Sequence, residues 1–284
     1  MLSSDDVTIA YRHFGGDGPP LLLAHATGFC AEVWRPMAAV LAPWFSCWGL
    51  DFRGHGRSTV PSSGSFRWSG TADDVLAVID DIEASDDRGG PWFGVGHSMG
   101  GASLLLAEER RPTTFGAMWL FEPIVAPPGL IDGGAEGDNP LADAAERRRP
   151  VFASRQAALD NYGSKPPMQA FARAALDGYL DGGLLEQPDG TVRLACEPAN
   201  EAKVFRMGGQ HDAFEHLHEI RCPATVARGA GMGFGPADFA PAVADRLPMG
   251  RLEEHPTLDH FGPMVDPVTL ANAILSVARP TITP

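Results

Sequence analysis

The segment Gly96-His97-Ser98-Met99-Gly100 places a serine between two glycines, each two residues away. It follows an apolar run that predicts a strand (Trp92–Val95) and precedes a pattern that predicts a helix (Met99–Arg110). The glycines allow the helix and the strand to approach each other at such a sharp turn. The first N–H groups of the helix would face any negative charge that develops beside the serine. The segment therefore predicts nucleophilic catalysis by Ser98.

A serine hydroxyl is a weak nucleophile near neutral pH, so Ser98 needs a general base. His260 lies after the last predicted strand and before the last predicted helix, in a loop that can return to the edge of a sheet. His97 adjoins the nucleophile in the chain, and we expect its side chain to point away. For five further histidines we expect structural positions (His25, His55) and surface or pocket-wall positions rather than a metal site (His211, His216, His218).

The elements that must position these residues alternate along the chain. Strands are predicted at Val7–His13, Leu21–Ala24, Cys47–Leu50, Trp92–Val95, Ala117–Phe121, Ala224–Ala227 and Gly250–Glu254. Helices are predicted at Ala31–Leu41, Thr71–Ala84, Met99–Arg110, Pro236–Leu247 and Pro267–Ala278. This alternation predicts a parallel sheet with helices on both faces.

The alternation stops between residues 125 and 207. This stretch shows no strand pattern, and proline and glycine separate short helical patterns. We therefore expect a core formed by residues 1–124 and 211–284, with residues 125–210 as a mostly helical cap over the site.

Four segments together resemble the α/β-hydrolase superfamily, in its serine-nucleophile branch, over nearly the whole length. They are Gly96–Gly100, Leu23–Phe29, Asp51–Ser58 and Asp259–Phe261. The resemblance implies a mostly parallel eight-stranded sheet flanked by helices, a helical cap, and catalysis without a cofactor or metal.

The segment Leu23–Phe29 resembles the superfamily's His-Gly-x-Pro segment. Ala26 and Gly28 stand where that pattern has its glycine and proline. By this resemblance the backbone N–H groups of Thr27 and Met99 would form an oxyanion hole.

The superfamily also orients its histidine with an acid, in the chain order serine, acid, histidine. The acid usually follows the strand predicted at Ala224–Ala227, but residues 228–237 contain no carboxylate before Asp238. Some members place it one strand earlier, where this chain has Glu122. A carboxylate with apolar neighbours is costly to bury without a partner, and an imidazolium is such a partner. We expect Glu122 to be the acid, with Asp238 as the alternative; Glu122 could also be a structural carboxylate bound to backbone N–H groups.

A substrate pocket is expected between the sheet edge and the insertion. If its walls are apolar, the substrate carries an apolar acyl or alcohol portion, although plain core packing explains the same residues equally well. The candidate wall residues are Phe29, Trp34, Ile124, Met168, Phe171 and Phe214.

The net charge of −14 over 284 residues argues against nucleic-acid binding. The one basic run, Arg147–Arg149, is expected at a solvated helix end. No apolar run approaches the ~18 residues of a membrane-spanning helix, and no secretory signal precedes the first strand. Four cysteines without C-x-x-C spacing favour reduced thiols and a cytoplasmic location. A small-molecule substrate is expected, and a homo-oligomer is left open.

Together these inferences predict a cofactor-independent serine hydrolase. It would cleave a carboxylic ester, including lactones and thioesters, through Ser98, His260 and Glu122 and an acyl-enzyme. Carbon–carbon bond hydrolysis and perhydrolysis use the same three groups and stay open. A catalytically silent ligand receptor on the same fold is an alternative of a different class.

Overall fold

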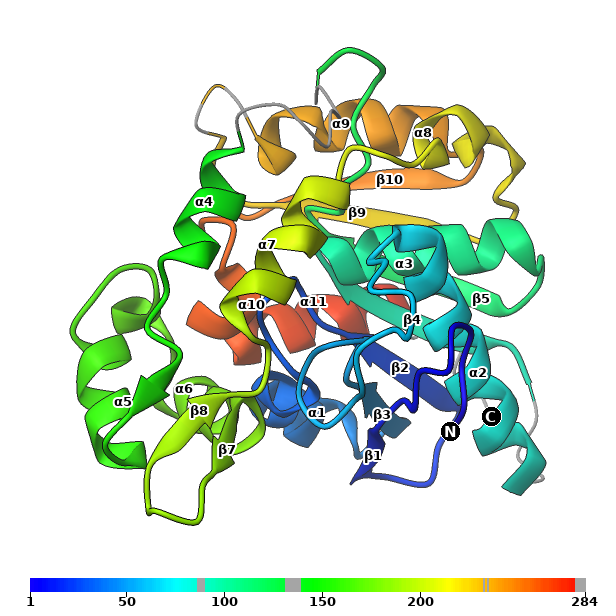
Figure 1. Cartoon of the computed structure of the whole chain (residues 1–284). Helices are drawn as coiled ribbons and strands as arrows, with labels where there is room; N and C mark the ends of the chain where they lie inside the picture. The colour runs from blue at the N-terminus through cyan, green and yellow to red at the C-terminus, as the bar shows by residue number, and fades with distance from the viewer. Residues whose placement is uncertain (86–89, 131–138, 232, 234, 279–284) are drawn as a thin grey trace.

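The computed structural model describes residues 1–85, 90–130, 139–231, 233 and 235–278. Its main sheet, within these residues, has seven strands in the order β1-β3-β2-β4-β5-β9-β10 (Figure 1). Neighbouring strands are parallel except β1, which runs antiparallel to β3. The strands are β1 (Tyr11–Gly15), β2 (Pro20–Ala24), β3 (Ser46–Leu50), β4 (Trp92–His97), β5 (Phe115–Phe121), β9 (Ala224–Arg228) and β10 (Gly250–Glu254).

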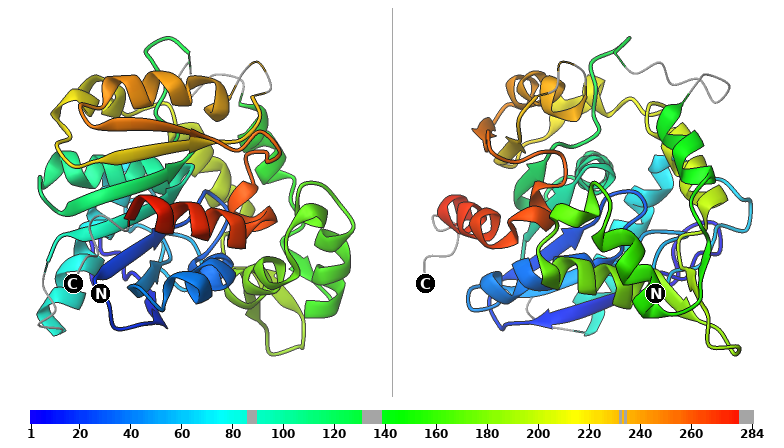
Figure 2. Two further views of the ribbon diagram at one scale, coloured as in Figure 1. Left: turned by 180° about the vertical axis from the view of Figure 1, so that it is seen from behind. Right: turned by 90° about the vertical axis from the view of Figure 1, so that its left-hand side faces the viewer.

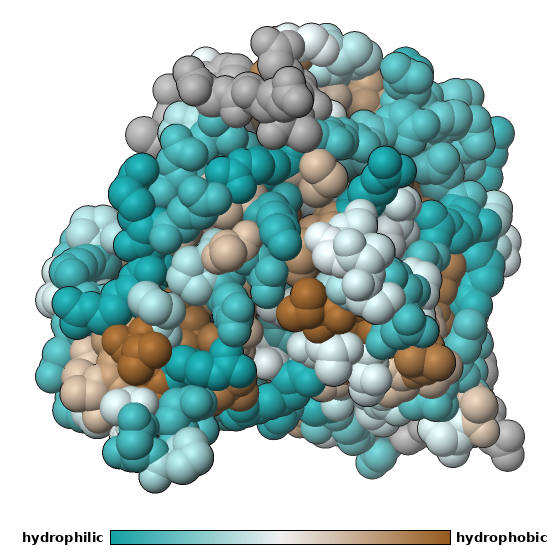
Figure 3. Space-filling model, viewed as in Figure 1, coloured by the Kyte–Doolittle hydropathy of each residue, from teal (hydrophilic) through white to brown (hydrophobic). Residues whose placement is uncertain are grey.

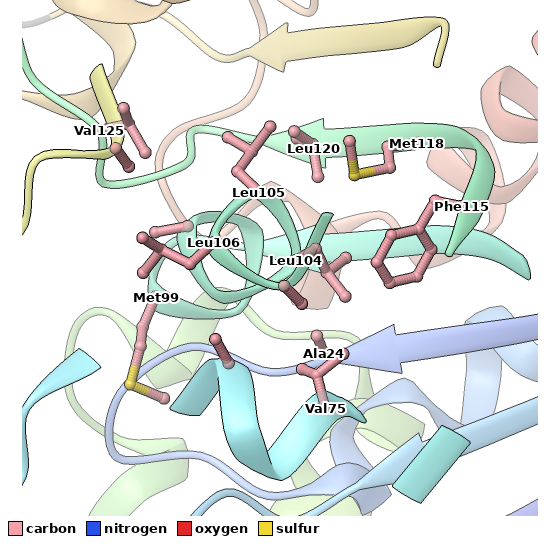
Figure 4. Packing of buried hydrophobic residues seen from close by; sticks show 14 of the residues in the cluster. Ala24, Val75, Met99, Leu104, Leu105, Leu106, Phe115, Met118, Leu120 and Val125 are labelled. Carbon is pink, nitrogen blue, oxygen red and sulfur yellow. The ribbon is translucent and has the colours of Figure 1, made fainter. Parts of the chain in front are cut away.

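Helices cover both faces of this sheet, which confirms the predicted layers (Figure 2). On one face lie α2 (Trp68–Ser85), α3 (Met99–Arg110) and α9 (Pro236–Arg246); on the other lie α1 (Arg35–Leu41) and α11 (Pro267–Ala278). Figure 4 shows Leu104 of α3 beside Phe115 and Met118 of β5, in the core under the first face. Shorter helices are η1 (Ala31–Trp34), α8 (Ala213–His216), η3 (Leu217–Glu219) and α10 (Gly262–Val265).

Within the described residues the main sheet has seven strands where the resemblance implied eight, and these seven correspond to the seven strands predicted from the sequence. The first of them was predicted at Val7–His13 but lies at Tyr11–Gly15, as β1. Asp5 and Asp6 both have positive φ, so the chain turns tightly there. Leu2 and Thr8 form only an isolated bridge across that turn. The N-terminal hairpin is therefore too short for a ladder, although the side chain of Val7 is fully buried.

The segment between β5 and β9 stands beside the sheet and adds no strand to it (left in Figure 1, facing the viewer in the right panel of Figure 2). The sequence predicted no strands in this segment, but the segment contains a small antiparallel sheet in the order β6-β8-β7. Its elements are α4 (Pro140–Glu146), β6 (Val151–Phe152), α5 (Arg155–Gly163), η2 (Met168–Ala170), α6 (Arg173–Gly183), β7 (Leu184–Glu186), β8 (Val192–Leu194) and α7 (Pro198–Met207). Strands of two or three residues are too short to show a period in the sequence.

The surface in Figure 3 is mainly hydrophilic, with small separate apolar patches. No helix in the described part of the chain is long and apolar enough to cross a membrane. All four cysteines are free and buried.

The strand register brings the ends of four strands to one edge. Ala24 of β2 pairs with Gly96 of β4, and Gly96 pairs with Leu120 of β5. Phe121 in turn pairs with Ala227 of β9. The loops that follow β2, β4, β5 and β9 therefore begin side by side, as the carboxyl ends of parallel strands do in ligand-binding α/β sheets.

Candidate active site

Ser98 occupies the turn between β4 and α3 in a strained conformation, with φ 56° and ψ −117°. Its N–H donates to the carbonyl of Phe121 at 3.0 Å, which ties the turn to β5. A Cβ on Gly100 would lie 2.1 Å from the carbonyl oxygen of Ala24, and one on Gly96 would lie 2.6 Å from the Cα of Gly101. Only glycine fits at these two positions, as the sequence pattern indicated.

Glu122 follows β5, and its side chain is almost fully buried. Its Oε2 lies 2.6 Å from Nδ1 of His260, and its Oε1 accepts a hydrogen bond from the N–H of Gly229 at 2.8 Å. The carboxylate thus has both of the partners considered from the sequence, an imidazole and a backbone N–H. The pair can hold the imidazole with Nδ1 protonated and Nε2 free to accept a proton.

Asp238, the alternative acid, lies elsewhere. It is exposed in the first turn of α9, and its Oδ1 accepts a hydrogen bond from the N–H of Gly233 at 3.3 Å. Within the described residues it makes no contact with His260.

We expected the side chain of His97 to point away from the site, but it contacts the backbone of His260. Its Nε2 donates to the backbone carbonyl of His260 at 2.7 Å, and the two rings are 4.8 Å apart. Burial and the nearby His260 lower the pKa of His97 well below its ordinary value, so the ring is neutral. His97 therefore holds the backbone of the residue whose side chain bonds Glu122; its place beside Ser98 was the only sequence signal for this contact.

Thr27, in the loop after β2, is buried and lies against the first turn of α3. Its Oγ1 contacts the sulfur of Met99 at 3.5 Å. In the described part of the chain the N–H of Thr27 makes no backbone hydrogen bond. Met99 opens α3, so its N–H is among those left without an intrahelical partner. The loop and the helix end thus bring two backbone donors to the same sheet edge.

Two buried histidines fix this loop on either side of Thr27. His25 contacts the carbonyl of Ala26 through Nδ1 at 2.7 Å, while His55 accepts the N–H of Gly28 at Nε2 at 3.0 Å. Burial lowers the pKa of His25 well below its ordinary value and that of His55 to about 4. Both rings are therefore neutral near pH 7, and each has a structural role.

Three aromatic rings from three separate segments meet near His260. Phe29 follows the loop of Thr27, Phe171 follows η2 in the insertion, and Phe261 follows His260. Their centroids are 6.0 Å (Phe29–Phe171), 6.3 Å (Phe29–Phe261) and 5.9 Å (Phe171–Phe261) apart. Phe261 was not among the pocket residues expected from the sequence. Met168 packs against the same buried cluster.

The other three expected pocket residues are placed differently. Trp34 belongs to the cluster of Phe29 but is fully buried in the core. Ile124 and Phe214 pack against the cluster on the opposite face of the sheet. Phe214 lines a separate cavity of about 140 Å³. Ile124 donates its N–H to the carbonyl of Ser98 at 3.2 Å and accepts at its own carbonyl from Nε2 of His211 at 2.9 Å.

No group of three or more histidine, cysteine, aspartate or glutamate side chains in the described residues is arranged to hold a metal ion. The strand ends bring together Ser98, the contact between Glu122 and His260, and the backbone N–H groups of Thr27 and Met99. Such a site can activate a serine hydroxyl and stabilise an oxyanion.

Comparison with known proteins assigns the class. Residues 21–273 match the Alpha/beta hydrolase family, and the chain belongs to that family. It is 27% identical over 266 residues to a non-heme chloroperoxidase from Streptomyces lividans, with 92% of each chain covered. The relatives include esterases and other hydrolases, and this supports the assignment of the protein as a hydrolase.

Two solved structures show the same fold. The crystal structure of E-2-(acetamidomethylene)succinate hydrolase superposes with a TM-score of 0.76 and 22% identity, covering 95% of this chain and 94% of the other. A malate-bound thermophilic esterase from Thermogutta terrifontis superposes with a TM-score of 0.70 and 20% identity, covering 98% and 95%.

Proposed function

We propose that this protein is a cofactor-independent serine hydrolase that cleaves carboxylic esters, including lactones and thioesters, of partly apolar small molecules. The observation that carries the proposal is the 2.6 Å contact between Glu122 and Nδ1 of His260, at the same sheet edge as Ser98. That contact is the arrangement by which a carboxylate orients a catalytic imidazole. Four buried free cysteines support a cytoplasmic location as part of the proposal.

The proposed reaction has two steps. In the first, the Oγ of Ser98 attacks the ester carbonyl while Nε2 of His260 takes its proton and passes it to the leaving alcohol. Glu122 keeps the Nδ1 proton in place and stabilises the imidazolium. The N–H groups of Thr27 and Met99 stabilise the tetrahedral oxyanion. In the second step water, deprotonated by His260, cleaves the acyl-enzyme and regenerates Ser98.

We further propose that residues 125–210 form a cap over the sheet edge, with residues 1–124 and 211–284 as the core. The rings of Phe29, Phe171 and Phe261 support this, because one comes from the insertion and two from the core. They would bind the apolar portion of the substrate.

A fluorophosphonate probe tests the nucleophile, because it reacts covalently only with an activated serine. We expect it to label the wild-type protein at Ser98, and we expect Ser98→Ala to remove the label and lower ester turnover by roughly 10⁴-fold or more. Ser103→Ala is the matched control: Ser103 is buried in α3 and hydrogen-bonded to Thr71, and its variant should keep both label and turnover. A wild-type protein that takes no label and hydrolyses none of a panel of esters of graded size would instead be a silent receptor.

Perhydrolysis is a second candidate, favoured by the similarity to the non-heme chloroperoxidase over 92% of the chain. In that reaction hydrogen peroxide replaces water at the acyl-enzyme and leaves as the peracid, while Ser98 regains its proton. Water and hydrogen peroxide would compete for the same acyl-enzyme. Peracid formation from acetate ester and peroxide, lost in Ser98→Ala, would establish it.

A further inference from the structure

Arg148 joins four α-helices of the insertion, α4, α5, α6 and α7, through one guanidinium group. It follows α4, its Nη1 pairs with Glu201 of α7, and its Nη2 donates to the hydroxyls of Tyr162 of α5 at 3.0 Å and Tyr179 of α6 at 2.5 Å. The expectation that the run Arg147–Arg149 decorates a solvated helix end is therefore wrong for its middle residue, whose side chain is only 19% exposed.

The ion pair is buried at a cost. The Glu201 side chain is 7% exposed, and this burial raises the pKa of its carboxyl while Arg148 opposes the rise. A buried ion pair is a weak source of stability, because the loss of hydration offsets much of the attraction. What the pair offers is a fixed position, since its partners hold the guanidinium on several sides.

The pair lies against the loop that contains Thr27. A Cβ on Gly28 would lie 2.4 Å from Oε1 of Glu201 and 3.5 Å from Nη1 of Arg148, so the carboxylate rests against the Gly28 backbone. Next along the chain, the ring of Phe29 meets the ring of Tyr179 edge to face at 5.6 Å. The insertion therefore contacts the two residues that follow Thr27.

The Gly28 backbone is held from two directions. His55 accepts its N–H at 3.0 Å from the core, and Glu201 occupies the space where a side chain would stand. Its φ of +82° also lies in the region that favours glycine. Gly28 is thus a point where the insertion and the core fix the same peptide.

We propose that the Arg148–Glu201 pair is a positioning device that sets the Thr27 amide by holding Gly28 in place. The inference rests on the proposed function, in which that amide stabilises the oxyanion. A donor displaced by a fraction of an ångström loses much of its effect in the transition state but little in substrate binding. Loss of the pair should therefore lower kcat and leave KM nearly unchanged.

The test removes both charges together, because Glu201→Gln alone leaves a buried, unpaired arginine and risks misfolding. The variant is Arg148→Met with Glu201→Met, assayed with a p-nitrophenyl ester. The control is Arg206→Met with Glu146→Met, which removes a more exposed pair at 2.9 Å between the same helices α7 and α4, with side chains 29% and 49% exposed. Hydrogen exchange of residues 26–29 and of β4 is measured on each.

In the Arg148/Glu201 variant we expect a kcat lower by roughly 10- to 100-fold, a KM within about threefold, and faster exchange at residues 26–29 but not in β4. The control variant should match the wild type in all three. Unchanged kcat, a change in KM alone, or unchanged exchange at residues 26–29 would each overturn the proposal. If the wild type hydrolyses no ester, the proposed function fails on that ground, and exchange alone decides whether the pair fixes the loop.

Discussion

Glu122 lies at the end of β5 with φ 46°, a left-handed conformation that few residues other than glycine adopt. Its N–H donates to the carbonyl of Ala227 at 2.8 Å, and its side chain accepts from Gly229 and contacts His260. Backbone strain of this kind persists where surrounding contacts determine the conformation, and it gathers at functional sites. The conformation is therefore consistent with the role proposed for this carboxylate.

Glu122→Gln keeps the shape of the side chain but removes the charge that stabilises an imidazolium. We expect ester turnover at saturating substrate to fall by about 10³- to 10⁴-fold, by analogy with the amide substitution in the serine-protease triad. Asp238→Asn is the comparison, because Asp238 is exposed and contacts its own loop; we expect a loss under about tenfold. Circular dichroism checks that both variants fold. If Asp238→Asn loses most of its ester turnover and Glu122→Gln stays near normal, Asp238 and not Glu122 is the acid.

At this scale the sequence predicts contacts that follow from strand order. Glu122 and Ser98 end neighbouring strands, so their approach to one edge could be expected from the alternation of elements alone. The contacts of His97 and Arg148 could not, because they depend on how loops and the insertion fold back. A run of three arginines looks solvated in the sequence, and only the tertiary structure shows that the middle one is turned inward.

Helix α3 packs so closely on the sheet that its first turn has no room for a side chain at Gly100. Gly100→Ala would place a methyl group 2.1 Å from a backbone carbonyl oxygen, which cannot move without shifting β2. We expect the free energy of unfolding to fall by roughly 3 kcal/mol or more, at or beyond the usual cost of overpacking. Urea unfolding measures it.

Gly163→Ala is the matched control for that substitution. Gly163 ends α5, and the nearest atom to an added Cβ is a side-chain carbon at 3.6 Å. Alanine also has the higher helix propensity, so we expect no loss, and up to about 1 kcal/mol of gain. Equal effects of the two substitutions would contradict the packing argument.

Helices and strands are predicted correctly where an apolar or periodic pattern spans enough residues to be seen, and they are missed where the element is only two or three residues long. Leu21–Ala24 reads as a buried strand, and these residues lie in β2 without exposure on either face. The strands β6, β7 and β8 span only two or three residues each, which is too short for an alternation of polar and apolar residues to show. The first strand begins later than predicted for another reason: Val7 and Ile9 are buried as a strand would bury them, but Leu2 and Thr8 form only an isolated bridge across the turn at Asp5 and Asp6.

The whole molecule contains four histidines whose pKa burial lowers, namely His25, His55, His97 and His211. The pKa of His55 falls from 6.5 to about 4. Between these values the His55 ring binds a proton more readily in the unfolded chain than in the folded one, so its contribution lowers the free energy of unfolding as pH decreases from about 6.5 towards 4. His55 alone accounts for roughly 3 kcal/mol at most.

Urea unfolding at pH 7, 6 and 5 measures this slope. His55→Gln should be less stable than the wild type at pH 7, because its hydrogen bonds to Gly28 and Arg53 are disturbed, yet lose less stability on acidification. His218→Gln, at an exposed position, should follow the wild type. A His55→Gln slope as steep as that of the wild type would show that this ring is not a source of the acid sensitivity.

The hydrogen bond from His211 to the carbonyl of Ile124 joins the two residues at which the insertion leaves and rejoins the core. A segment whose ends touch can be lengthened, shortened or transplanted without pulling on the strands that carry it. We therefore expect the proposed cap, residues 125–210, to tolerate changes of length and sequence, provided that Arg148 and Glu201 keep their places against Gly28. Substrate range could then change through substitutions in the cap away from this pair, while the residues at the strand ends stay the same.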